Sequence, residues 1–126
     1  MTKLREIYYC KHCKNLVEVL QVGAGTLECC GEAMLLLEAN STDAANEKHV
    51  PAIVDHGDSI EVTVGSVVHP MTEEHYITFI ECLTTKGVCR KELKPGDPPV
   101  ANFKIKKDEL LSVREFCNLH MLWKKE

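Results

Sequence analysis

The chain has 126 residues, 44% of them hydrophobic and 27% charged, which is an ordinary globular composition with enough length to bury a core. Its formal net charge of −4 and the lack of a basic run argue against a protein that binds nucleic acid. No segment has the apolar length of a signal peptide or a membrane span, so we expect a cytoplasmic protein without membrane association. An odd count of seven cysteines in that reducing compartment favours metal ligation over disulfides.

The first 38 residues form one compositional unit, which we expect to be a module separate from residues 39–126. Four of the seven cysteines lie here, together with β-like stretches at 6–9, 16–20 and 34–37 and a glycine-containing turn at 21–26. So few residues cannot bury enough apolar surface to fold alone. A bound metal therefore has to supply the missing stability.

The rest of the chain shows repeated signals for short strands. Helix-capping side chains at 40–43 predict one helical turn at 44–48, which Pro51 ends. Strand patterns follow at 59–64, 75–83, 88–93 and 101–105, and the second and third of these are expected to pair as a hairpin. Residues 107–115 fit either a strand or a helix. This pattern predicts an all-β fold, a small antiparallel sandwich or barrel.

Cys10 and Cys13 form a C-x-x-C pair, and the adjacent pair Cys29 and Cys30 follows after fifteen residues. Two such pairs complete a tetrahedron of thiolates, a donor set that selects zinc or iron. Spacing alone leaves a structural zinc knuckle open. Adjacent ligands, however, reach one ion only with a strained backbone, and a purely structural zinc site has little reason to use them. His12, between the first two cysteines, is expected to be an exposed loop residue.

Four histidines and one further cysteine are candidates for a second metal site: His49, His69, His75, Cys117 and His120. The first of them precedes a strand-rich region, the next two span a single loop, and the last two form a C-x-x-H pair. Zinc normally takes four ligands, whereas five protein ligands leave one position open on an octahedral ion such as ferrous iron. Neutral imidazoles and one thiolate leave this ion a net positive charge, which favours a small anionic ligand.

We expect two other cysteines and one other histidine to have no part in metal binding. Cys82 lies on an apolar strand and is expected in the core, because free cysteine packs as a small hydrophobe. Cys89 is its expected cross-strand neighbour, and His56 is expected to be exposed in a hairpin.

Six short motifs, YYCKHC, ECC, EKHVP, HPM, EEHYI and CNLH, occur in this order along nearly the whole chain. In them the sequence resembles the desulfoferrodoxin-type superoxide reductases of the two-iron class. The resemblance implies a desulforedoxin-like four-cysteine iron module at 1–38 and an immunoglobulin-like antiparallel β-sandwich at 39–126 that carries the active-site iron. It implies one iron on Cys10, Cys13, Cys29 and Cys30. It implies a second iron with His49, His69, His75 and His120 as equatorial ligands and Cys117 as the axial ligand.

The resemblance also implies an activity, the one-electron reduction of superoxide to hydrogen peroxide. Lys48 is then the candidate for attracting the anion and for holding a proton-donating water. Glu47 resembles the family glutamate that can occupy the open position of the ferric site. A rubredoxin-like electron donor and a homodimer are implied as partners.

Two alternatives remain at this point. One is a two-iron electron-transfer protein that binds no small-molecule substrate. The other is a zinc-stabilised binding module. The first alternative is distinguished from a superoxide reductase by mixing the reduced protein with superoxide. The second is distinguished by metal analysis and optical spectra, because a ferric tetrathiolate site is strongly coloured and a zinc site is not.

Overall fold

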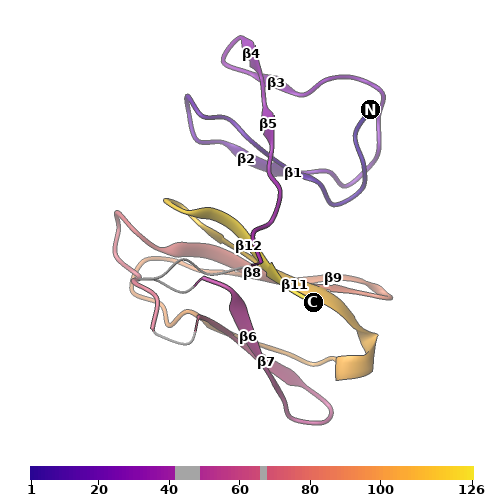
Figure 1. Ribbon diagram of the computed structural model, residues 1–126, viewed down its shortest axis with the longest axis vertical. Helices are drawn as coiled ribbons and strands as arrows, with labels where there is room; N and C mark the ends of the chain where they lie inside the picture. Colours follow the sequence, from indigo (N-terminus) through magenta and orange to yellow (C-terminus); the bar gives the residue numbers. More distant parts are fainter. Residues whose placement is uncertain (42–48, 66–67) are drawn as a thin grey trace. The chain divides into compact units, whose positions relative to one another are not determined.

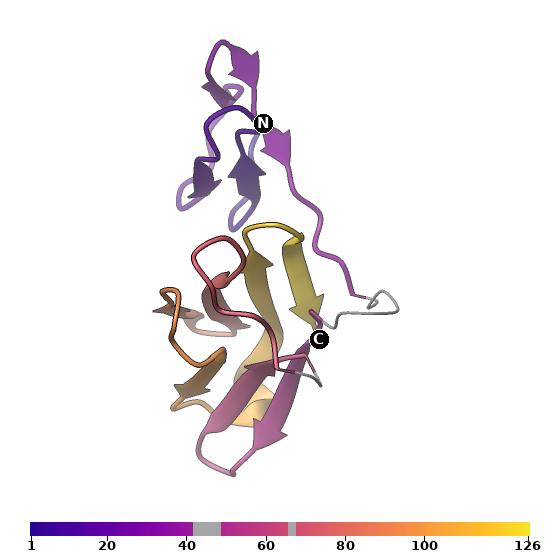
Figure 2. The same cartoon turned by 90° about the vertical axis from the view of Figure 1, so that its left-hand side faces the viewer.

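The computed structural model describes residues 1–41, 49–65 and 68–126 (Figures 1 and 2). The chain divides into two compact units, Met1–Glu38 and Ala39–Glu126. In the described residues the regular structure consists of strands and one short 3-10 helix, and no helix has the length and apolar character needed to cross a membrane. The helical turn predicted at 44–48 lies outside the described residues.

The N-terminal unit is built from two small antiparallel sheets. The first has the strand order β2–β1–β5, with β1 at Ile7–Tyr9, β2 at Leu16–Glu18 and β5 at Leu35–Leu36. The second pairs β3 (Glu28–Cys29) with β4 (Glu32–Ala33). The predicted strands at 6–9, 16–20 and 34–37 are confirmed with shorter bounds, whereas β3 and β4 were not predicted.

The core of this unit is very small. Ile7 and Tyr9 on β1 point to its buried side with Val19 and Cys10, while Tyr8 lies on the opposite face of the sheet. A handful of buried side chains cannot offset the conformational entropy of about forty ordered residues, which costs roughly 1–2 kcal/mol each for the backbone. The structure therefore agrees with a module that depends on a bound metal for its stability.

The second unit is a sandwich of two antiparallel sheets, so the sandwich is the correct choice between the two architectures that the strand pattern left open (Figure 1). One sheet has the order β10–β7–β6 and the other has the order β12–β11–β8–β9. The strand bounds are β6 Pro51–Asp55, β7 Ile60–Val64, β8 Ile77–Thr84, β9 Gly87–Glu92, β10 Val100–Phe103, β11 Leu110–Cys117 and β12 Met121–Lys125.

The core of the sandwich follows the alternation of each strand. On β7 the side chains of Ile60, Val62 and Val64 are buried and alternate with the less buried Glu61 and Thr63, as predicted. They pack with apolar side chains of the facing sheet, which include Ile77, Ile80, Cys82, Val113 and Cys117. The thiol of Cys117 thus comes from the hydrophobic core itself.

One open alternative is decided by the structure, and two strands were not predicted. Residues 107–115 contain only one 3-10 turn, Lys107–Glu109, and continue as strand β11. Strand β6 was missed because Pro51 was interpreted as a helix terminator, whereas proline is also tolerated as the first residue of a strand. Strand β12 was missed because its polar end, Lys124 and Lys125, hides the alternation, and pairing with β11 decides its conformation.

The structural roles predicted for three residues are confirmed. Cys82 is fully buried, and it lies directly opposite Cys89 across the β8–β9 hairpin. His56 is exposed in the turn between β6 and β7, where its Nε2 atom lies 3.2 Å from Glu61 Oε1.

The outer face of the larger sheet carries a buried carboxylate, Glu81 on β8. The Arg90 guanidinium from β9 donates to it at 2.9 Å, and Arg114 from β11 donates to its other oxygen. Arg90 also lies over the ring of Phe79, 5.9 Å from the centroid. The two guanidinium groups compensate the desolvation of the carboxylate and connect three strands.

Candidate functional site

The four N-terminal cysteines come from two tight turns. Cys10 directly follows β1, its N–H donates to Asn15 O at 2.9 Å, and its carbonyl accepts from Lys14 N at 2.8 Å. Cys29 ends β3, and Cys30 begins the two-residue turn to β4 with a φ of 54°, followed by Gly31 at 73°. The left-handed conformation of a non-glycine residue is the strained backbone expected for adjacent ligands.

The spacing of the four sulfurs fits one metal ion. The Sγ atoms of Cys13 and Cys29 are 3.4 Å apart, those of Cys29 and Cys30 are 3.9 Å apart, and all four lie within 4.8 Å of one another. A tetrahedron with metal–sulfur bonds of about 2.3 Å has edges of roughly 3.8 Å. All four cysteines are free thiols, so the cluster is not a pair of disulfides.

The electrostatics of these sulfurs also point to a cation. Backbone N–H groups of Cys13 and His12 hydrogen-bond to the Cys10 sulfur and lower the pKa of this thiol to about 6. The pKa of Cys30 is raised to about 12, because its thiol donates to Cys13 and Cys10 and negative charge gathers around it. So many sulfurs at this distance cannot all be thiolates unless a cation lies between them. His12 is exposed, 3.4 Å from Glu32, as expected for a loop residue.

The second cluster is assembled from four segments of the sandwich. His49 lies just before β6, His69 and His75 lie in the connection between β7 and β8, Cys117 ends β11, and His120 lies in the turn to β12. Cys117 is fully buried, whereas His75 is half-buried and His120 is exposed. The cluster therefore runs from the core to the surface of the sandwich.

The four imidazoles surround a common centre. In the order His49, His69, His75, His120 and back to His49, neighbouring ring centroids are 4.7, 4.7, 5.1 and 4.7 Å apart. The diagonal from His49 to His75 is longer, at 6.5 Å, as expected for the corners of a near-square. Such an arrangement matches the four equatorial positions of an octahedral ion.

The thiol of Cys117 belongs to the same group. Its Sγ atom lies within 4.8 Å of ligand atoms of His49, His69 and His75, and it is 3.9 Å from His120 Nδ1. His120 Nδ1 is in turn 3.0 Å from His49 Nε2. Imidazoles with one thiolate suit a first-row transition metal such as iron, so the donor chemistry and the spacing of this cluster both fit the predicted ion.

One hydrogen bond defines the tautomer of a candidate ligand. His69 Nδ1 lies 2.7 Å from the carbonyl oxygen of Pro70, and a carbonyl only accepts hydrogen bonds, so Nδ1 carries the proton. A neutral His69 therefore has its lone pair on Nε2, the nitrogen left for a metal. Bonds of this kind orient the ring and raise the basicity of the ligand.

Trp123 contacts two candidate ligands, and the sequence interpretation missed it. Its indole stacks on His49, with ring centroids 4.8 Å apart and an interplanar angle of 17°, and its Nε1 donates to His120 O at 2.9 Å. One side chain thus supports two candidate ligands. The signal that was available is its position, three residues after the C-x-x-H pair. Glu47 and Lys48, the predicted catalytic residues, lie outside the described residues.

Comparison with known proteins gives matches along almost the whole chain. Residues 41–126 match the family model "Desulfoferrodoxin", and residues 2–37 match "Desulfoferrodoxin, N-terminal domain". The desulfoferrodoxin of Nitratidesulfovibrio vulgaris is 52% identical over 121 residues, which cover 96% of this chain and 95% of that protein. The desulfoferrodoxin homolog of Archaeoglobus fulgidus is 49% identical over 123 residues, 98% of each chain. The crystal structure of the superoxide reductase from Treponema pallidum superposes with a TM-score of 0.79 at 33% identity, covering 96% of this chain and 97% of that one.

The fold and the two clusters define a non-haem iron protein with one tetrathiolate centre and one histidine–thiolate centre. The chain belongs to the desulfoferrodoxin family. The predicted resemblance is thereby confirmed, as are the all-β fold with an immunoglobulin-like sandwich and the presence of two iron sites per chain.

Proposed function

We infer that this protein is a superoxide reductase that reduces superoxide to hydrogen peroxide at an iron ion in the sandwich. We propose as its ligands His49, His69, His75, His120 and Cys117. The observation that carries this conclusion is the near-square of four imidazoles with a buried thiol beside it. The superoxide reductase of Treponema pallidum, which covers nearly the whole chain, supports the same function.

When bound, ferrous iron supplies the single electron that, with two protons, converts superoxide to hydrogen peroxide. The protein has to hold the ion in that state and leave room for the substrate. Four neutral imidazoles and one thiolate give a divalent centre one net positive charge, which attracts an anion. The exposure of His120 brings one side of the site to the surface, where a diatomic anion can enter.

Cys117 is the second feature of the chain that would support the reaction. Its position in the apolar core excludes water from the sulfur, so no solvent hydrogen bonds would weaken its electron donation to a bound metal. Thiolate ligation increases the electron density at the iron, as it does in thiolate-ligated haem proteins. Burial also protects this sulfur from the peroxide that the reaction produces.

We propose Lys48 and Glu47 as the catalytic side chains outside the ligand set. They occupy the two sequence positions before His49, which is a buried member of the cluster. The ammonium group of Lys48 would attract superoxide toward a protein whose net charge is −4 and would hold the water that donates a proton. The carboxylate of Glu47 would stabilise the oxidised site and exclude other anions.

The test of the function is the reaction of the fully reduced protein with a pulse of superoxide. We expect one superoxide consumed per ferrous ion in the sandwich, with hydrogen peroxide formed and no dioxygen released. An electron-transfer protein without a small-molecule substrate would leave the decay of superoxide unchanged, and a dismutase would release dioxygen.

We propose that the two units are separate functional domains, 1–38 and 39–126, and that Cys10, Cys13, Cys29 and Cys30 hold the first iron. A rubredoxin-like protein is the proposed electron donor. Its candidacy is tested by mixing the reduced donor with the oxidised protein and following the colour of both centres.

We also propose a cytoplasmic location, because all seven cysteines are free thiols, which persist in a reducing compartment.

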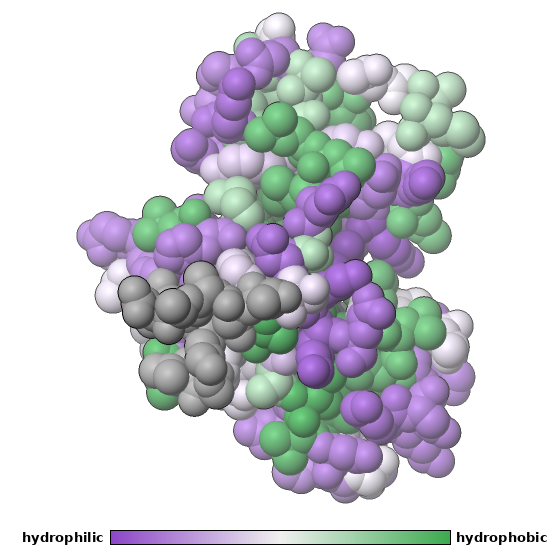
Figure 3. All heavy atoms as spheres, viewed as in Figure 1, coloured by the Kyte–Doolittle hydropathy of each residue, from purple (hydrophilic) through white to green (hydrophobic). Residues whose placement is uncertain are grey.

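A homodimer is the proposed assembly, and the surface of the N-terminal unit supports it. Tyr8 pairs with Val17 on one side and with Leu36 on the other, so the three side chains form a row across the sheet. Val17 is 39% exposed and Leu36 is 46% exposed. Hydrophobic residues are visible on the surface of this unit in Figure 3. A row of exposed apolar side chains is a surface that a second copy can cover.

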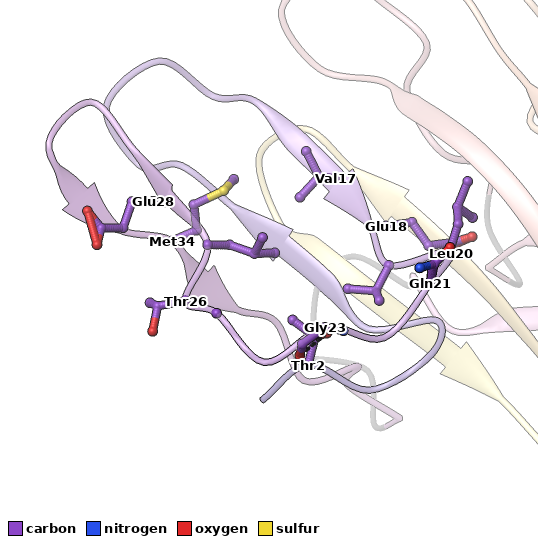
Figure 4. A pocket seen from close by; sticks show the side chains of 12 residues that line it. Thr2, Val17, Glu18, Leu20, Gln21, Gly23, Thr26, Glu28 and Met34 are labelled. Carbon is purple, nitrogen blue, oxygen red and sulfur yellow. Dashed lines mark hydrogen bonds between the residues drawn. The ribbon is translucent and has the colours of Figure 1, made fainter.

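Val17 also lines an open cavity of about 530 Å³, together with Leu20 and Met34 among others (Figure 4). We expect Leu36→Lys to convert the dimer to a monomer in light scattering at micromolar concentration. Val54→Lys, at an equally exposed position of β6, is the matched control and should remain dimeric. A wild-type protein that is monomeric would contradict the proposed assembly.

A further inference from the structure

Asn118 connects two loops that carry candidate iron ligands. Its carboxamide oxygen accepts a hydrogen bond from the backbone N–H of Tyr76 at 2.9 Å, and its carboxamide nitrogen donates to the carbonyl oxygen of Glu74 at 3.0 Å. Its own backbone N–H donates to Tyr76 O at 3.1 Å. Glu74 and Tyr76 flank His75, and Asn118 directly follows Cys117, so three hydrogen bonds join the two segments.

The loop that carries His75 is closed by its own hydrogen bonds. The backbone N–H of Thr72 donates to His75 O at 2.9 Å, and the backbone N–H of His75 donates to Thr72 O at 3.2 Å and to Thr72 Oγ1 at 3.1 Å. These bonds determine the shape of the loop. They do not determine where the loop stands relative to the end of β11, which carries Cys117.

We propose that Asn118 is a positioning residue that holds the imidazole of His75 in register with Cys117 and His120 for iron binding. The inference rests on the proposed function, because it takes these three residues as ligands of one ion. A ligand that comes from a loop has to be held to within a fraction of an ångström, and hydrogen bonds behind the ligands commonly provide this restraint.

The chemistry of the side chain is specific. A carboxamide of this length offers one acceptor to Tyr76 N and one donor to Glu74 O. An aspartate would keep the acceptor but would place a second negative oxygen against the Glu74 carbonyl. An alanine would lose both bonds and keep only the backbone contact.

The experiment measures the affinity of the sandwich site for ferrous iron by anaerobic competition with a chelator, in the full chain. We expect Asn118→Ala to weaken this affinity by about ten-fold or more, the usual effect of losing a residue that orients a ligand. The tetrathiolate centre of the same molecule serves as an internal reference and should keep its iron. Asn102→Ala changes an exposed asparagine on β10 and should leave both sites unchanged.

A second measurement does not depend on iron. In the metal-free protein, hydrogen exchange of the Tyr76 amide should be faster in Asn118→Ala than in wild type, and Asn118→Asp should preserve its protection while weakening iron binding to an intermediate degree. Wild-type affinity together with wild-type exchange in Asn118→Ala would overturn the proposal. So would a loss of iron that accompanies general unfolding of the metal-free variants. A wild-type chain that binds no iron in the sandwich would overturn the proposed function itself.

Discussion

At the scale of single residues, Cys117 separates this site from an ordinary histidine cluster. Its sulfur is buried with apolar side chains of the sandwich, and yet it lies beside four imidazoles, of which His75 is half-buried and His120 is exposed. A buried thiol in apolar surroundings is inert and protonated in most proteins. Here an adjacent metal ion would make it a thiolate, and the core would then shield this thiolate from water and oxidants.

Replacing Cys117 tests this role directly. We expect Cys117→Ser to lose the thiolate-to-iron charge-transfer band of the sandwich centre and the reduction of superoxide, because serine supplies no thiolate, and to keep the bands of the tetrathiolate centre. The measurement is the visible spectrum of the oxidised protein, together with its reaction with superoxide. Cys89→Ser, on the β8–β9 hairpin, is the control and should retain the band. A sandwich-centre band that survives in Cys117→Ser would show that another thiol is the ligand.

A substitution of Lys48 tests whether a single positive charge attracts the substrate. We expect Lys48→Ile to bind iron normally but to react with superoxide about ten-fold more slowly or worse, the low end of electrostatic steering. Added salt should slow the wild-type reaction by screening the attraction and should affect the variant less. Pulse radiolysis at several salt concentrations measures both effects.

Lys104→Ile is the matched control for this variant. Lys104 follows β10, whose last residue pairs with Ile60 at the end of β7 that lies away from His49. The control removes the same charge and should react at nearly the wild-type rate. Equal rates and equal salt dependence in Lys48→Ile and wild type would make Lys48 an ordinary solvated lysine.

A third prediction at this scale concerns the reactivity of the Cys82 thiol. Burial, followed by the nearby Cys89 and Glu81, raises the pKa of Cys82 to about 12. At pH 8 it is therefore a neutral thiol, and the thiolate is the reactive form. We expect iodoacetamide to modify Cys89 well before Cys82 in the folded protein. Trypsin cuts after Lys86, so the two cysteines fall in different peptides for mass spectrometry. Modification of both at the same rate would show that Cys82 is accessible.

At the scale of elements, strand β11 contributes both to the apolar core of the sandwich and to the buried ion pairs of Glu81. One of its faces presents Val113 and Cys117 to the core, and the other presents Arg114 to the buried Glu81 on β8. The same strand ends at the thiol of the metal site. The ion pairs of Glu81 thus hold together the three strands β8, β9 and β11, the last of which ends at Cys117.

Removal of this buried charge is a test of stability. We expect Glu81→Gln to lower the free energy of unfolding of the sandwich by about 3 kcal/mol, because two guanidinium groups lose their carboxylate. Urea denaturation followed by the fluorescence of Trp123, the only tryptophan, reports on this unit. Glu92→Gln, on the exposed end of β9, should change the stability by less than about 0.5 kcal/mol. Equal stability of the two variants would assign Glu81 no structural role.

The elements also show what the sequence could predict. Alternation on Ile60, Val62 and Val64 identified β7 because one face of this strand is buried and the other is not. Part of the candidate ligand set was recognisable because C-x-x-C and C-x-x-H spacings have few uses other than metal binding, whereas His49, His69 and His75 lie in no such spacing and were proposed from their positions at strand ends and from the family resemblance. The near-square of imidazoles was not derivable from spacing, since it depends on how three loops meet. Trp123 and Asn118 were missed for the same reason, because their contacts with ligand segments exist only in the folded sandwich.

At the scale of the whole molecule, the two metal centres do not share residues. The four cysteines of the first belong to Met1–Glu38, and the histidines and Cys117 of the second belong to Ala39–Glu126. The first unit has a very small core, whereas the second has an extensive one. The two units therefore differ in how strongly their folds depend on iron, since metal binding can replace a missing core only where the core is missing.

A single substitution distinguishes the two centres. We expect Cys29→Ser to remove one of two irons per chain and the colour of the tetrathiolate centre, and to unfold much of the N-terminal unit. The sandwich site should keep its iron and its reaction with superoxide, because its ligands lie in the other unit. Iron analysis, visible spectra and superoxide kinetics on the same sample measure all three. The reciprocal variant, His69→Ala, should lose the sandwich iron and leave the tetrathiolate spectrum intact. If Cys29→Ser lost both irons, the two units would not be independent metal-binding domains, and the tetrathiolate centre would be needed for the stability of the sandwich as well as its own.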